Sequence, residues 1–385
     1  MRILFIASTS DWGGASNALY LLVRELCKDN TVGVILPSTH GKLYKEMSAI
    51  DTRIYIEKYG LTSYSYHKDP IKWAIKTLEM MIKRSHAKNR IKNIISDFKP
   101  DIVHTNVGPL DIALDYCIKN NIPHVWHHRE YQEQIGIHFF PSTRTFNKYI
   151  HLKGNYNIAI TQGLFCHLKL REGIDRTIYD GVFSDKEISH LNIGARKKQI
   201  ICVGRIEPSK GIMELLSAFS VFSKSHQEYD LLIIGSASES EYYRKCLEYA
   251  SENCIPEKVH FMGELDKEEV FNIMSDSECL VSPSRSEGFG FVTIEAMMNG
   301  CIVIGRNVSG LKEQFDLGQY YSGKEIALRF NSETELLCCL EDVSENRHEE
   351  LRKSAFQYAT NSYSIEKSVN NTIDYYNEIL GISHE

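Results

Sequence analysis

The sequence predicts an α/β protein made of two doubly wound parallel-sheet domains that face each other across a cleft. The first observation is a series of short continuous apolar runs, typical of strands buried on both faces of a parallel sheet. The second is that helix-periodic stretches separate several of these runs, and the third is that the alternation restarts after a polar passage near mid-chain. With 385 residues, 43% of them hydrophobic, the chain can bury two cores.

The first domain is expected to cover residues 1–180 and to be Rossmann-like. It opens with the apolar run RILFIA at residues 2–7, which is followed by the loop STSDWGGAS and a helix-periodic stretch. Further buried strands are expected at residues 32–36, 102–104, 124–126 and 158–160. In open α/β sheets ligands bind beyond the carboxyl ends of the strands, so the loops that follow these strands are the informative ones.

The second domain, also Rossmann-like, is expected to cover residues 199–363. Its five strand candidates lie at residues 199–205, 230–235, 258–263, 279–284 and 301–305. Residues 181–198 are polar and of low periodicity, so we expect them to link the two domains. In residues 364–380 apolar side chains recur at helical spacing, which predicts a helix that packs back on the first domain.

The cysteines and the hydropathy pattern bear on the cellular compartment. The chain has ten cysteines, without a C-x-x-C pair and mostly within apolar runs, where a free thiol behaves as a small hydrophobe. This pattern favours a reducing cytoplasm and argues against a zinc site. The opening apolar run is too short for a signal peptide, and no stretch approaches the roughly 18 apolar residues of a membrane span, so a cytoplasmic protein is expected.

The charge is distributed unevenly along the chain. Residues 1–190 contain 25 Lys and Arg against 19 Asp and Glu, whereas the whole chain has a net charge of −6. Residues 68–99 concentrate nine basic against three acidic residues. Within them Ile71, Ile75, Leu78 and Ile82 share one helix face. Such a segment either contacts the anionic surface of a membrane as a peripheral helix or is simply solvated, and both interpretations stay open.

Two loops that follow expected strands carry features of anion sites. Gly13 and Gly14 let the backbone approach a ligand just before a helix N-terminus, although a tight turn without a ligand explains them equally well. In the second domain the loop RIEPSKG places Arg205 and Lys210 before a helix. Two cations at that position suit a diphosphate, and the alternative is two solvated surface charges.

The segment SRSEGFGFVTIEAMMNG contains Glu287 and Glu295, which are separated by seven residues. A carboxylate accepts hydrogen bonds from neighbouring hydroxyls, so one acid suits the diol of a hexose and the other that of a ribose. The backbone amides of the Gly288-Phe289-Gly290 turn are free to point toward the same ligand. Alternatively, Glu295 is a residue of the helix start that is favoured by the helix dipole.

These motifs together resemble the retaining glycosyltransferases of the GT-B fold known as glycosyl transferases group 1, or family 4. The resemblance covers nearly the whole chain: the GG loop, GRIEPSKG, and EGFGFVTIE followed by GCIVIG and SGLKE. It implies that Arg205 and Lys210 hold the donor diphosphate and that Glu295 binds the nucleotide ribose. It also implies that Glu287 and the amides of 288–290 hold the donor sugar, and that the SGLKE loop approaches the same pocket.

The sequence departs from the family at one position of the first domain. Many members have a histidine in a P-x-V-x-x-x-H setting, whereas this chain reads PHVWHHREY, with Arg129 at that spacing and His127 two residues earlier. His127 and Arg129 are therefore candidate catalytic residues beside Arg205, Lys210 and Glu287. Which of His127, His128, Arg129 and Glu130 face the reacting centre stays open.

The resemblance implies transfer of a hexosyl group from a nucleotide sugar to a saccharide acceptor. If residues 68–99 contact a membrane, the acceptor is lipid-linked and the pathway is cell-surface polysaccharide biosynthesis at the inner face of the cell membrane. No D-x-D motif is present, so neither a metal nor another cofactor is expected, and no nucleic acid partner is expected. A sugar-nucleotide epimerase of the same fold and a non-catalytic partner subunit remain alternatives. A nicotinamide dehydrogenase is disfavoured because G-x-G-x-x-G is missing.

Overall fold

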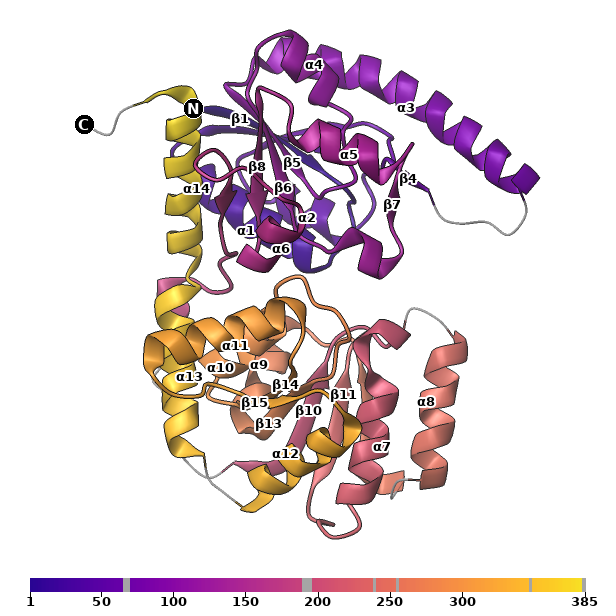
Figure 1. Ribbon diagram of the computed structural model, residues 1–385, viewed down its shortest axis with the longest axis vertical. Coiled ribbons are helices and arrows are strands. Elements are labelled where there is room, and N and C mark those ends of the chain that lie inside the picture. The colour runs from indigo at the N-terminus through magenta and orange to yellow at the C-terminus, as the bar shows by residue number, and fades with distance from the viewer. Residues whose placement is uncertain (65–69, 189–195, 238–239, 254–255, 346–347, 383–385) are drawn as a thin grey trace. The chain divides into compact units, whose positions relative to one another are not determined.

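In a computed structural model the chain forms two compact α/β units, as the sequence predicts. Unit 1 comprises Met1–Gly181 and Ile365–Glu385, and unit 2 comprises Val182–Ser364. The structure describes residues 1–64, 70–188, 196–237, 240–253, 256–345 and 348–382 (Figure 1). Parts of two expected segments, residues 189–195 of the linker and residues 68–69 of the basic segment, therefore lie outside the described residues.

Unit 1 is built on a parallel sheet in the order β3-β2-β1-β5-β6-β8-β9. Its strands are β1 (Arg2–Ala7), β2 (Thr31–Leu36), β3 (Arg53–Ile56), β5 (Ile102–Asn106), β6 (His124–His128), β8 (Asn155–Ala159) and β9 (Arg176–Thr177). The five strands expected from apolar runs are all present. The sequence analysis does not predict the edge strands β3 and β9, because each is short and begins with an arginine, and at most three hydrophobic residues follow it.

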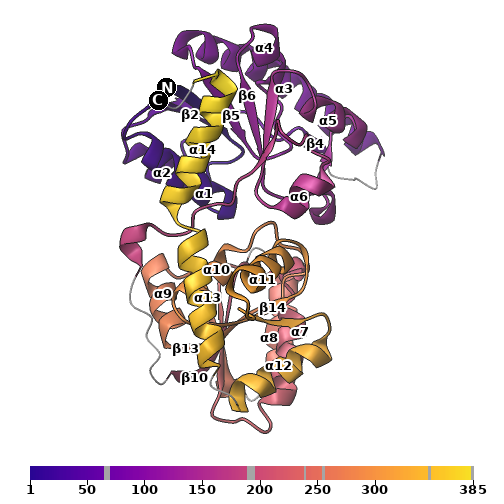
Figure 2. The same cartoon turned by 60° about the vertical axis from the view of Figure 1, so that its left-hand side comes forward.

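Helices cover both faces of this sheet (Figures 1 and 2). The helices are α1 (Gly14–Leu26), α2 (Lys42–Ser48), α3 (Pro70–Phe98), α4 (Leu114–Lys119), α5 (Thr143–Ile150), α6 (Gln162–His167) and α14 (Ile365–Leu380). A separate two-stranded antiparallel ribbon pairs β4 (Ser63–Tyr64) with β7 (His138–Phe139). Alternate residues of β1 serve the two faces: Ile3 and Phe5 pack with α1, α2 and α14, whereas Leu4 and Ile6 pack with α3. The C-terminal helix α14 is thus part of the unit 1 core.

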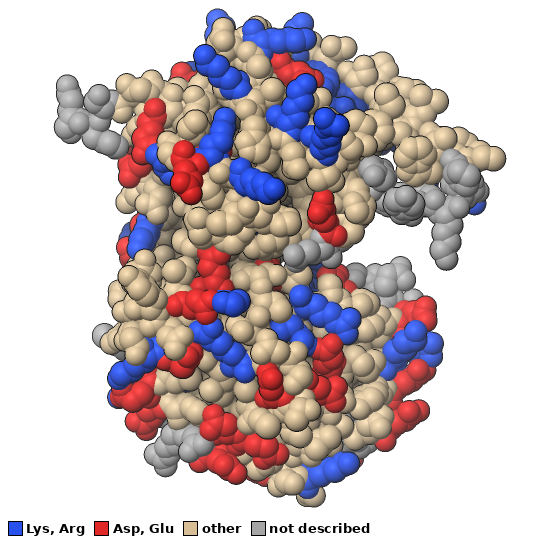
Figure 3. Space-filling model, viewed as in Figure 1, with Lys and Arg blue, Asp and Glu red and all other residues tan. Residues whose placement is uncertain are grey.

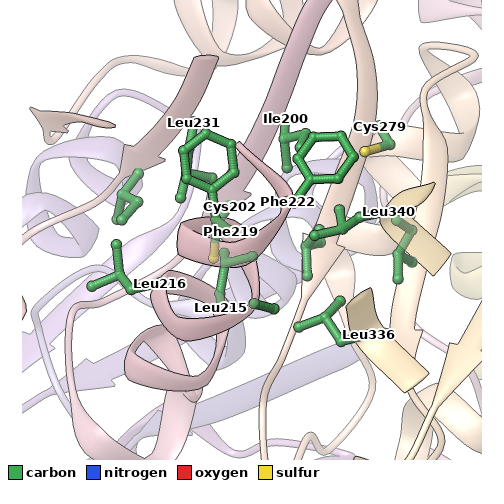
Figure 4. Packing of buried hydrophobic residues seen from close by; sticks show 14 of the residues in the cluster. Ile200, Cys202, Leu215, Leu216, Phe219, Phe222, Leu231, Cys279, Leu336 and Leu340 are labelled. Carbon is green, nitrogen blue, oxygen red and sulfur yellow. The ribbon is translucent and has the colours of Figure 1, made fainter. Parts of the chain in front are cut away.

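Unit 2 repeats the plan with a parallel sheet in the order β12-β11-β10-β13-β14-β15. Its strands are β10 (Lys197–Val203), β11 (Asp230–Ile234), β12 (Val259–Gly263), β13 (Ser277–Ser282), β14 (Ile302–Arg306) and β15 (Leu328–Phe330). Its helices are α7 (Ile212–Phe222), α8 (Ser240–Asn253), α9 (Lys267–Asp276), α10 (Phe291–Met298), α11 (Ser309–Ser322), α12 (Glu333–Glu345) and α13 (Glu349–Ser362). Figure 4 shows Phe219 and Phe222 of α7 against Ile200, Leu231 and Cys279 of the sheet.

The helices of the described residues include no membrane span. α3 has 29 residues, but it is too polar to cross a bilayer, and no other described helix combines the necessary length and hydropathy. The described cysteines are free thiols, and Cys117, Cys202, Cys246, Cys279 and Cys301 are buried within the two cores.

Strands β5 and β6 carry four buried histidines: His104, His124, His127 and His128. Burial lowers the pKa of His124 and of His128 to about 4. Burial also holds the pKa values of His104 and His127 well below the usual range, and the positive charge of Arg129 lowers them further. Because both ring nitrogens of His124 are hydrogen-bonded, to Thr105 at 2.9 Å and Asn155 at 2.6 Å, the neutral ring is part of the core.

We expect unit 1 to lose stability as the pH falls from about 6.5 to about 4. In this window the unfolded histidines bind protons that the folded ones do not, which costs up to about 1.4 kcal/mol per pH unit for each histidine. All three tryptophans lie in unit 1, so urea unfolding followed by tryptophan fluorescence at several pH values measures it. His128→Gln should flatten the pH dependence, whereas the control His86→Gln, at an exposed position, should not. Equal slopes for the two variants would contradict the expectation.

Candidate functional site

Three loops of unit 2 meet at the carboxyl edge of its sheet. The loop after β10 contacts the loop after β13, where the amide of Arg285 donates to the carbonyl of Ser209 at 2.9 Å. The loop after β13 in turn contacts the start of α11, where the amide of Gly310 donates to the carbonyl of Glu287 at 2.9 Å. The sequence-predicted residues of unit 2 lie on these loops or on the helix that follows.

The ammonium of Lys210 forms an ion pair with the carboxylate of Glu287, with 2.8 Å between Nζ and Oε2. Both side chains are 24% exposed, so the pair is partly shielded from water yet reachable by a ligand. Lys210 ends a short 3-10 turn at Gly211, whose φ of +68° favours glycine. A side chain on Gly211 would also meet the carbonyl oxygen of Pro283 at 2.3 Å, so this glycine allows the two loops to approach.

Arg205 follows β10 on the same loop and is the more exposed cation, with 63% of its side chain in solvent. Its guanidinium lies 3.4 Å from Glu207, a contact that is weak at this exposure. The Arg205 side chain therefore remains able to reorient toward an anion, in contrast to the paired Lys210.

The turn of Gly288, Phe289 and Gly290 is held by its carbonyl groups. The side-chain amide of Gln314 donates to the carbonyls of Phe289 and Gly290, and the hydroxyl of Thr293 donates to Gly290 at 2.7 Å. Gly290 has a φ of +95° and directly precedes α10 without any side-chain cap. The turn is thus fixed before ligand binding, and the first amides of α10 have no capping side chain.

Glu295 is the fifth residue of α10 and is partly buried. The alternative interpretation, an acid at the helix start, does not fit this position, because the first turn of α10 contains no acidic residue. Burial raises the pKa of Glu295 to about 7, an effect that the positive charge of Lys267 partly offsets. At neutral pH both protonation states of this carboxyl group are therefore populated.

Two further arginines, which the sequence interpretation missed, fix the loop geometry. Arg285 donates to Glu214 of α7 at 2.8 Å, and Arg306 at the end of β14 pairs with the same carboxylate. Arg306 also donates from Nε to the carbonyl of Pro283 at 3.1 Å. For Arg306 the only sequence signal is its position as a charged residue at the end of the apolar strand IVIGR. This signal does not reveal that Glu214 is its partner.

In unit 1, Arg129 is buried at the carboxyl edge of the sheet. It forms an ion pair with Asp180, donates from Nε to Asn106 Oδ1 at 2.7 Å, and lies 3.3 Å from His127 Nδ1. Burial raises the pKa of Asp180, although the Arg129 charge counteracts it. The His127 Nε2 atom is buried without a hydrogen-bond partner, so one polar group of this network is unused.

The other candidates around β6 lie differently. His128 hydrogen-bonds to Asn157 at 3.0 Å and contacts the ring of Trp126, whereas Glu130 is partly exposed. His127 and Arg129, two positions apart, share one network, as strand alternation requires. Their catalytic role stays a prediction.

The glycine loop of unit 1 is joined to this network. Asn106, which accepts from Arg129, donates to the carbonyl of Ala15 in the first turn of α1 at 3.1 Å. Gly13 has an extended backbone with a φ of −179°, and a side chain there would meet nothing within 4 Å. A strained turn therefore does not explain this glycine, and the space beside it is open to a ligand.

The chain resembles known glycosyltransferases in sequence and in fold. The profile of the family described as glycosyl transferases group 1 matches residues 183–362, which nearly coincide with unit 2. A glycogen synthase of Mycobacterium tuberculosis is 22% identical over 303 residues, or 74% of this chain and 70% of that protein. A lipopolysaccharide 1,2-N-acetylglucosaminetransferase of Salmonella typhimurium is 29% identical over 133 residues, or 32% of this chain and 34% of that protein.

Among solved structures, HepE of Anabaena in complex with UDP has a TM-score of 0.77 and 16% identity, and the match covers 98% of this chain and 100% of HepE. HepE has also been solved with UDP-glucose, with a TM-score of 0.74 and 15% identity over 98% of this chain and 100% of HepE. At such identities the likeness concerns the fold.

Proposed function

Because residues 183–362 belong to the family of glycosyl transferases group 1 and the chain has the GT-B fold, we propose that it is a retaining, nucleotide-sugar-dependent hexosyltransferase. One observation carries this proposal: at the carboxyl edge of unit 2 the Lys210 ammonium lies 2.8 Å from the Glu287 carboxylate. In a nucleotide sugar the diphosphate is bonded directly to the sugar. Groups that bind these two parts must therefore be neighbours, as Lys210 and Glu287 are.

We assign the remaining donor contacts by the chemistry of the side chains. Arg205 and Lys210 hold the diphosphate, Glu287 and the turn of 288–290 hold the sugar hydroxyls, and Glu295 accepts from the ribose hydroxyls. Uridine diphosphate is the first nucleotide to test, because HepE was solved with UDP and UDP-glucose. Within unit 1, the backbone beside Gly13 is open to a ligand, since a side chain there would meet nothing within 4 Å.

The chemical step requires that the departing diphosphate be stabilised. The bond between the anomeric carbon and the phosphate oxygen breaks while the acceptor oxygen attacks from the same face, and the acceptor proton passes to that phosphate oxygen. Arg205 and Lys210 offset the developing negative charge, so the step needs neither a metal nor a protein nucleophile.

The acceptor is proposed to be a lipid-linked saccharide in cell-surface polysaccharide biosynthesis, reached at the cytoplasmic face of the membrane. Support comes from α3, where Ile71, Ile75, Leu78 and Ile82 are each more than half exposed. The net charge of residues 1–190 is +6, and Figure 3 shows Lys and Arg side chains gathered on unit 1 in that view. The similarity to a lipopolysaccharide transferase points in the same direction.

Transfer should depend on an added acceptor and survive excess chelator. The assay is the release of UDP from a panel of UDP-sugars, UDP-glucose first, with free and lipid-linked saccharides as acceptors. Lys210→Ala should lower the rate by about 10²-fold, since the loss of one transition-state stabiliser typically costs 10²- to 10³-fold. The control Lys224→Ala changes an exposed lysine of unit 2 and should leave the rate unchanged.

Two results would contradict parts of this proposal. Activity that is lost in chelator and restored by Mg²⁺ or Mn²⁺ would show that a metal stabilises the leaving group. Interconversion of the UDP-sugar without any acceptor would identify an epimerase instead.

Binding of UDP should weaken as the pH falls through about 7. The ribose hydroxyls donate to the ionised Glu295, whose pKa of about 7 means that roughly a tenth of it remains ionised at pH 6. Calorimetric titration should therefore give affinity several-fold lower at pH 6 than at pH 8. Glu295→Gln should bind weakly at both pH values, and this variant corrects for the titration of UDP itself.

The variant Glu287→Gln provides the comparison for the paired acids. It should mainly lower turnover and keep the pH dependence of UDP binding, because Glu287 is assigned to the sugar. Equal UDP affinity of wild type and Glu295→Ala would refute the ribose assignment.

Unit 1 should bind anionic vesicles through α3. Each basic residue near an anionic bilayer contributes on the order of 1 kcal/mol, and salt screens this attraction over roughly 8 Å. Co-sedimentation should show binding to phosphatidylglycerol vesicles but not to neutral ones, reduced by high salt and by Lys72→Glu with Lys76→Glu. The matched control, Lys224→Glu with Lys245→Glu, changes exposed lysines of unit 2 by the same charge. Equal partitioning of both double variants would favour a solvated α3 and a soluble acceptor.

A further inference from the structure

Arg129 lies directly after β6 and is 4% exposed. Its guanidinium contacts three side chains at once: it pairs with Asp180, donates from Nε to Asn106 Oδ1 at 2.7 Å, and donates from Nη2 to His127 Nδ1 at 3.3 Å. Because the donors of a guanidinium form a rigid planar fork, these partners fix its orientation. Asp180 also neutralises its charge, so Arg129 is suited to hold its neighbours and not to bind a phosphate.

The acceptors Asp180 and Asn106 are held in place as well. Asp180 is buried and lies 51 positions further along the chain. Asn106, at the end of β5, is also buried. Since a guanidinium only donates, Asn106 turns its oxygen toward Arg129, and its Nδ2 donates to the carbonyl of Ala15 at 3.1 Å. The Arg129 fork is therefore anchored to two buried side chains.

The contact with Arg129 decides where His127 carries its proton. A guanidinium has no lone pair that can accept, so His127 Nδ1 must be the acceptor of this hydrogen bond. Burial and the positive charge of Arg129 hold the pKa of His127 well below its usual range, so the ring is neutral at pH 7. A neutral imidazole has one N–H group, and in His127 this group is therefore at Nε2.

The Nε2–H group of His127 is a buried donor, and no residue that the structure describes accepts a hydrogen bond from it. The neighbouring His104 ring, 5.4 Å away between ring centroids, bonds through Nδ1 to the Tyr376 hydroxyl at 2.5 Å. Buried donors are nearly always paired, within the protein or with a ligand or bound water. His127 lies one residue before the end of β6, at the edge of the sheet where ligands bind in open α/β folds.

We propose that Asp180 and Asn106 are positioning residues that act through Arg129 to present His127 as a neutral hydrogen-bond donor to a hydroxyl oxygen of the saccharide substrate. This oxygen belongs to the donor sugar or to the acceptor, which share the same chemistry. The inference rests on the proposed transferase function and deepens it, because it gives His127 a defined role. It also excludes His127 as a general base, since Arg129 occupies Nδ1 and Nε2 already carries the proton.

Two substitutions of His127 distinguish a hydrogen-bond donor from a base. Glutamine keeps an N–H donor near the position of Nε2 but is not basic, whereas phenylalanine has an aromatic ring of similar size and no donor. In the UDP-release assay His127→Phe should lower kcat/KM about tenfold, the worth of one hydrogen bond, whereas His127→Gln should stay within about threefold of wild type. A His127→Gln enzyme as impaired as His127→Phe would identify a base and overturn the proposal.

The position of the proton is measured by NMR on protein labelled with ¹⁵N-histidine. The resonances of His127 are those that are missing from the spectrum of His127→Phe. In the ligand-free protein at pH 7 we expect a proton on Nε2 and none on Nδ1. A proton on Nδ1, or on both nitrogens, would overturn the proposal. Because no substrate is present, this result is independent of the proposed transferase function.

The positioning role is tested with Arg129→Lys, which keeps the positive charge but lacks the planar fork, and with Asp180→Asn, which removes the ion pair. Both variants should show a mixture of His127 tautomers and a turnover lowered about tenfold, with unchanged UDP affinity. If Asp180→Asn fails to fold because Arg129 stays buried without its partner, Arg129→Gln with Asp180→Asn removes both charges and takes its place.

The matched control is Arg171→Gln with Asp175→Asn. It removes another ion pair of unit 1, in which the Asp175 side chain is fully buried. The hydrogen bonds of this pair involve neither Arg129 nor His127. The control should therefore leave the His127 tautomer and the turnover unchanged, and an equal effect of both sets of variants would contradict a specific positioning role.

UDP-glucose and the acceptor that supports UDP release are added separately to the labelled protein. A shift of the Nε2 proton with UDP-glucose but not with UDP assigns the contact to the donor sugar, and a shift that requires the acceptor assigns it to the acceptor. If neither substrate shifts this proton although transfer proceeds, the substrate contact is overturned, and a bound water between His104 and His127 accounts for the donor. Absence of all transfer overturns the proposed function, whereas the tautomer of the ligand-free protein still decides the positioning role.

Discussion

Parallel pairing of β10 with β13 is the constraint on which the candidate site of unit 2 depends. The pairing of Ile200 with Cys279 and of Ile201 with Leu280 brings the carboxyl ends of both strands to one edge. The loops that follow are then close enough for Lys210 to reach Glu287, 77 positions later in the chain. Gly310 makes the third loop fit, since a side chain there would meet the carbonyl oxygen of Gly288 at 2.4 Å.

The two units use their ion pairs differently. Lys210 and Glu287 are partly exposed, so a ligand can exchange their mutual contact for contacts of its own at modest cost. Arg129 and Asp180 are almost completely buried, and taking both charges out of water costs about as much as their attraction returns. Such a pair contributes little stability. Arg129 lies at a strand end and is bonded to Asn106, next to the glycine loop, so we interpret the pair as a means of holding the Arg129 side chain in place.

α3 joins a structural and a surface role in one helix. Its C-terminal half supplies core residues of unit 1, among them Ile91 and Phe98, whereas its N-terminal half exposes the apolar side chains of Ile71, Ile75, Leu78 and Ile82. Exposed apolar side chains clustered on one helix face contribute nothing to the stability of the isolated chain. These side chains, the neighbouring lysines and the excess of basic residues in the first half of the sequence are the features on which the proposed membrane contact rests.

The parallel-sheet class, the main strands of both units, the loops that carry Arg205, Lys210 and Glu287, and the helix that carries Glu295 could all be predicted from the sequence, because continuous apolar runs and strand-end motifs are local signals. The edge strands β3, β9 and β15 could not be predicted, because they have only 4, 2 and 3 residues, too few for a clear periodic or apolar signal. The ion pairs are visible only in the folded chain: Lys210 pairs with Glu287, Glu214 joins Arg285 to Arg306, and Asp180 pairs with the buried Arg129. These partners are far apart in the sequence, and side-chain contacts between them arise only when strand pairing brings their loops together.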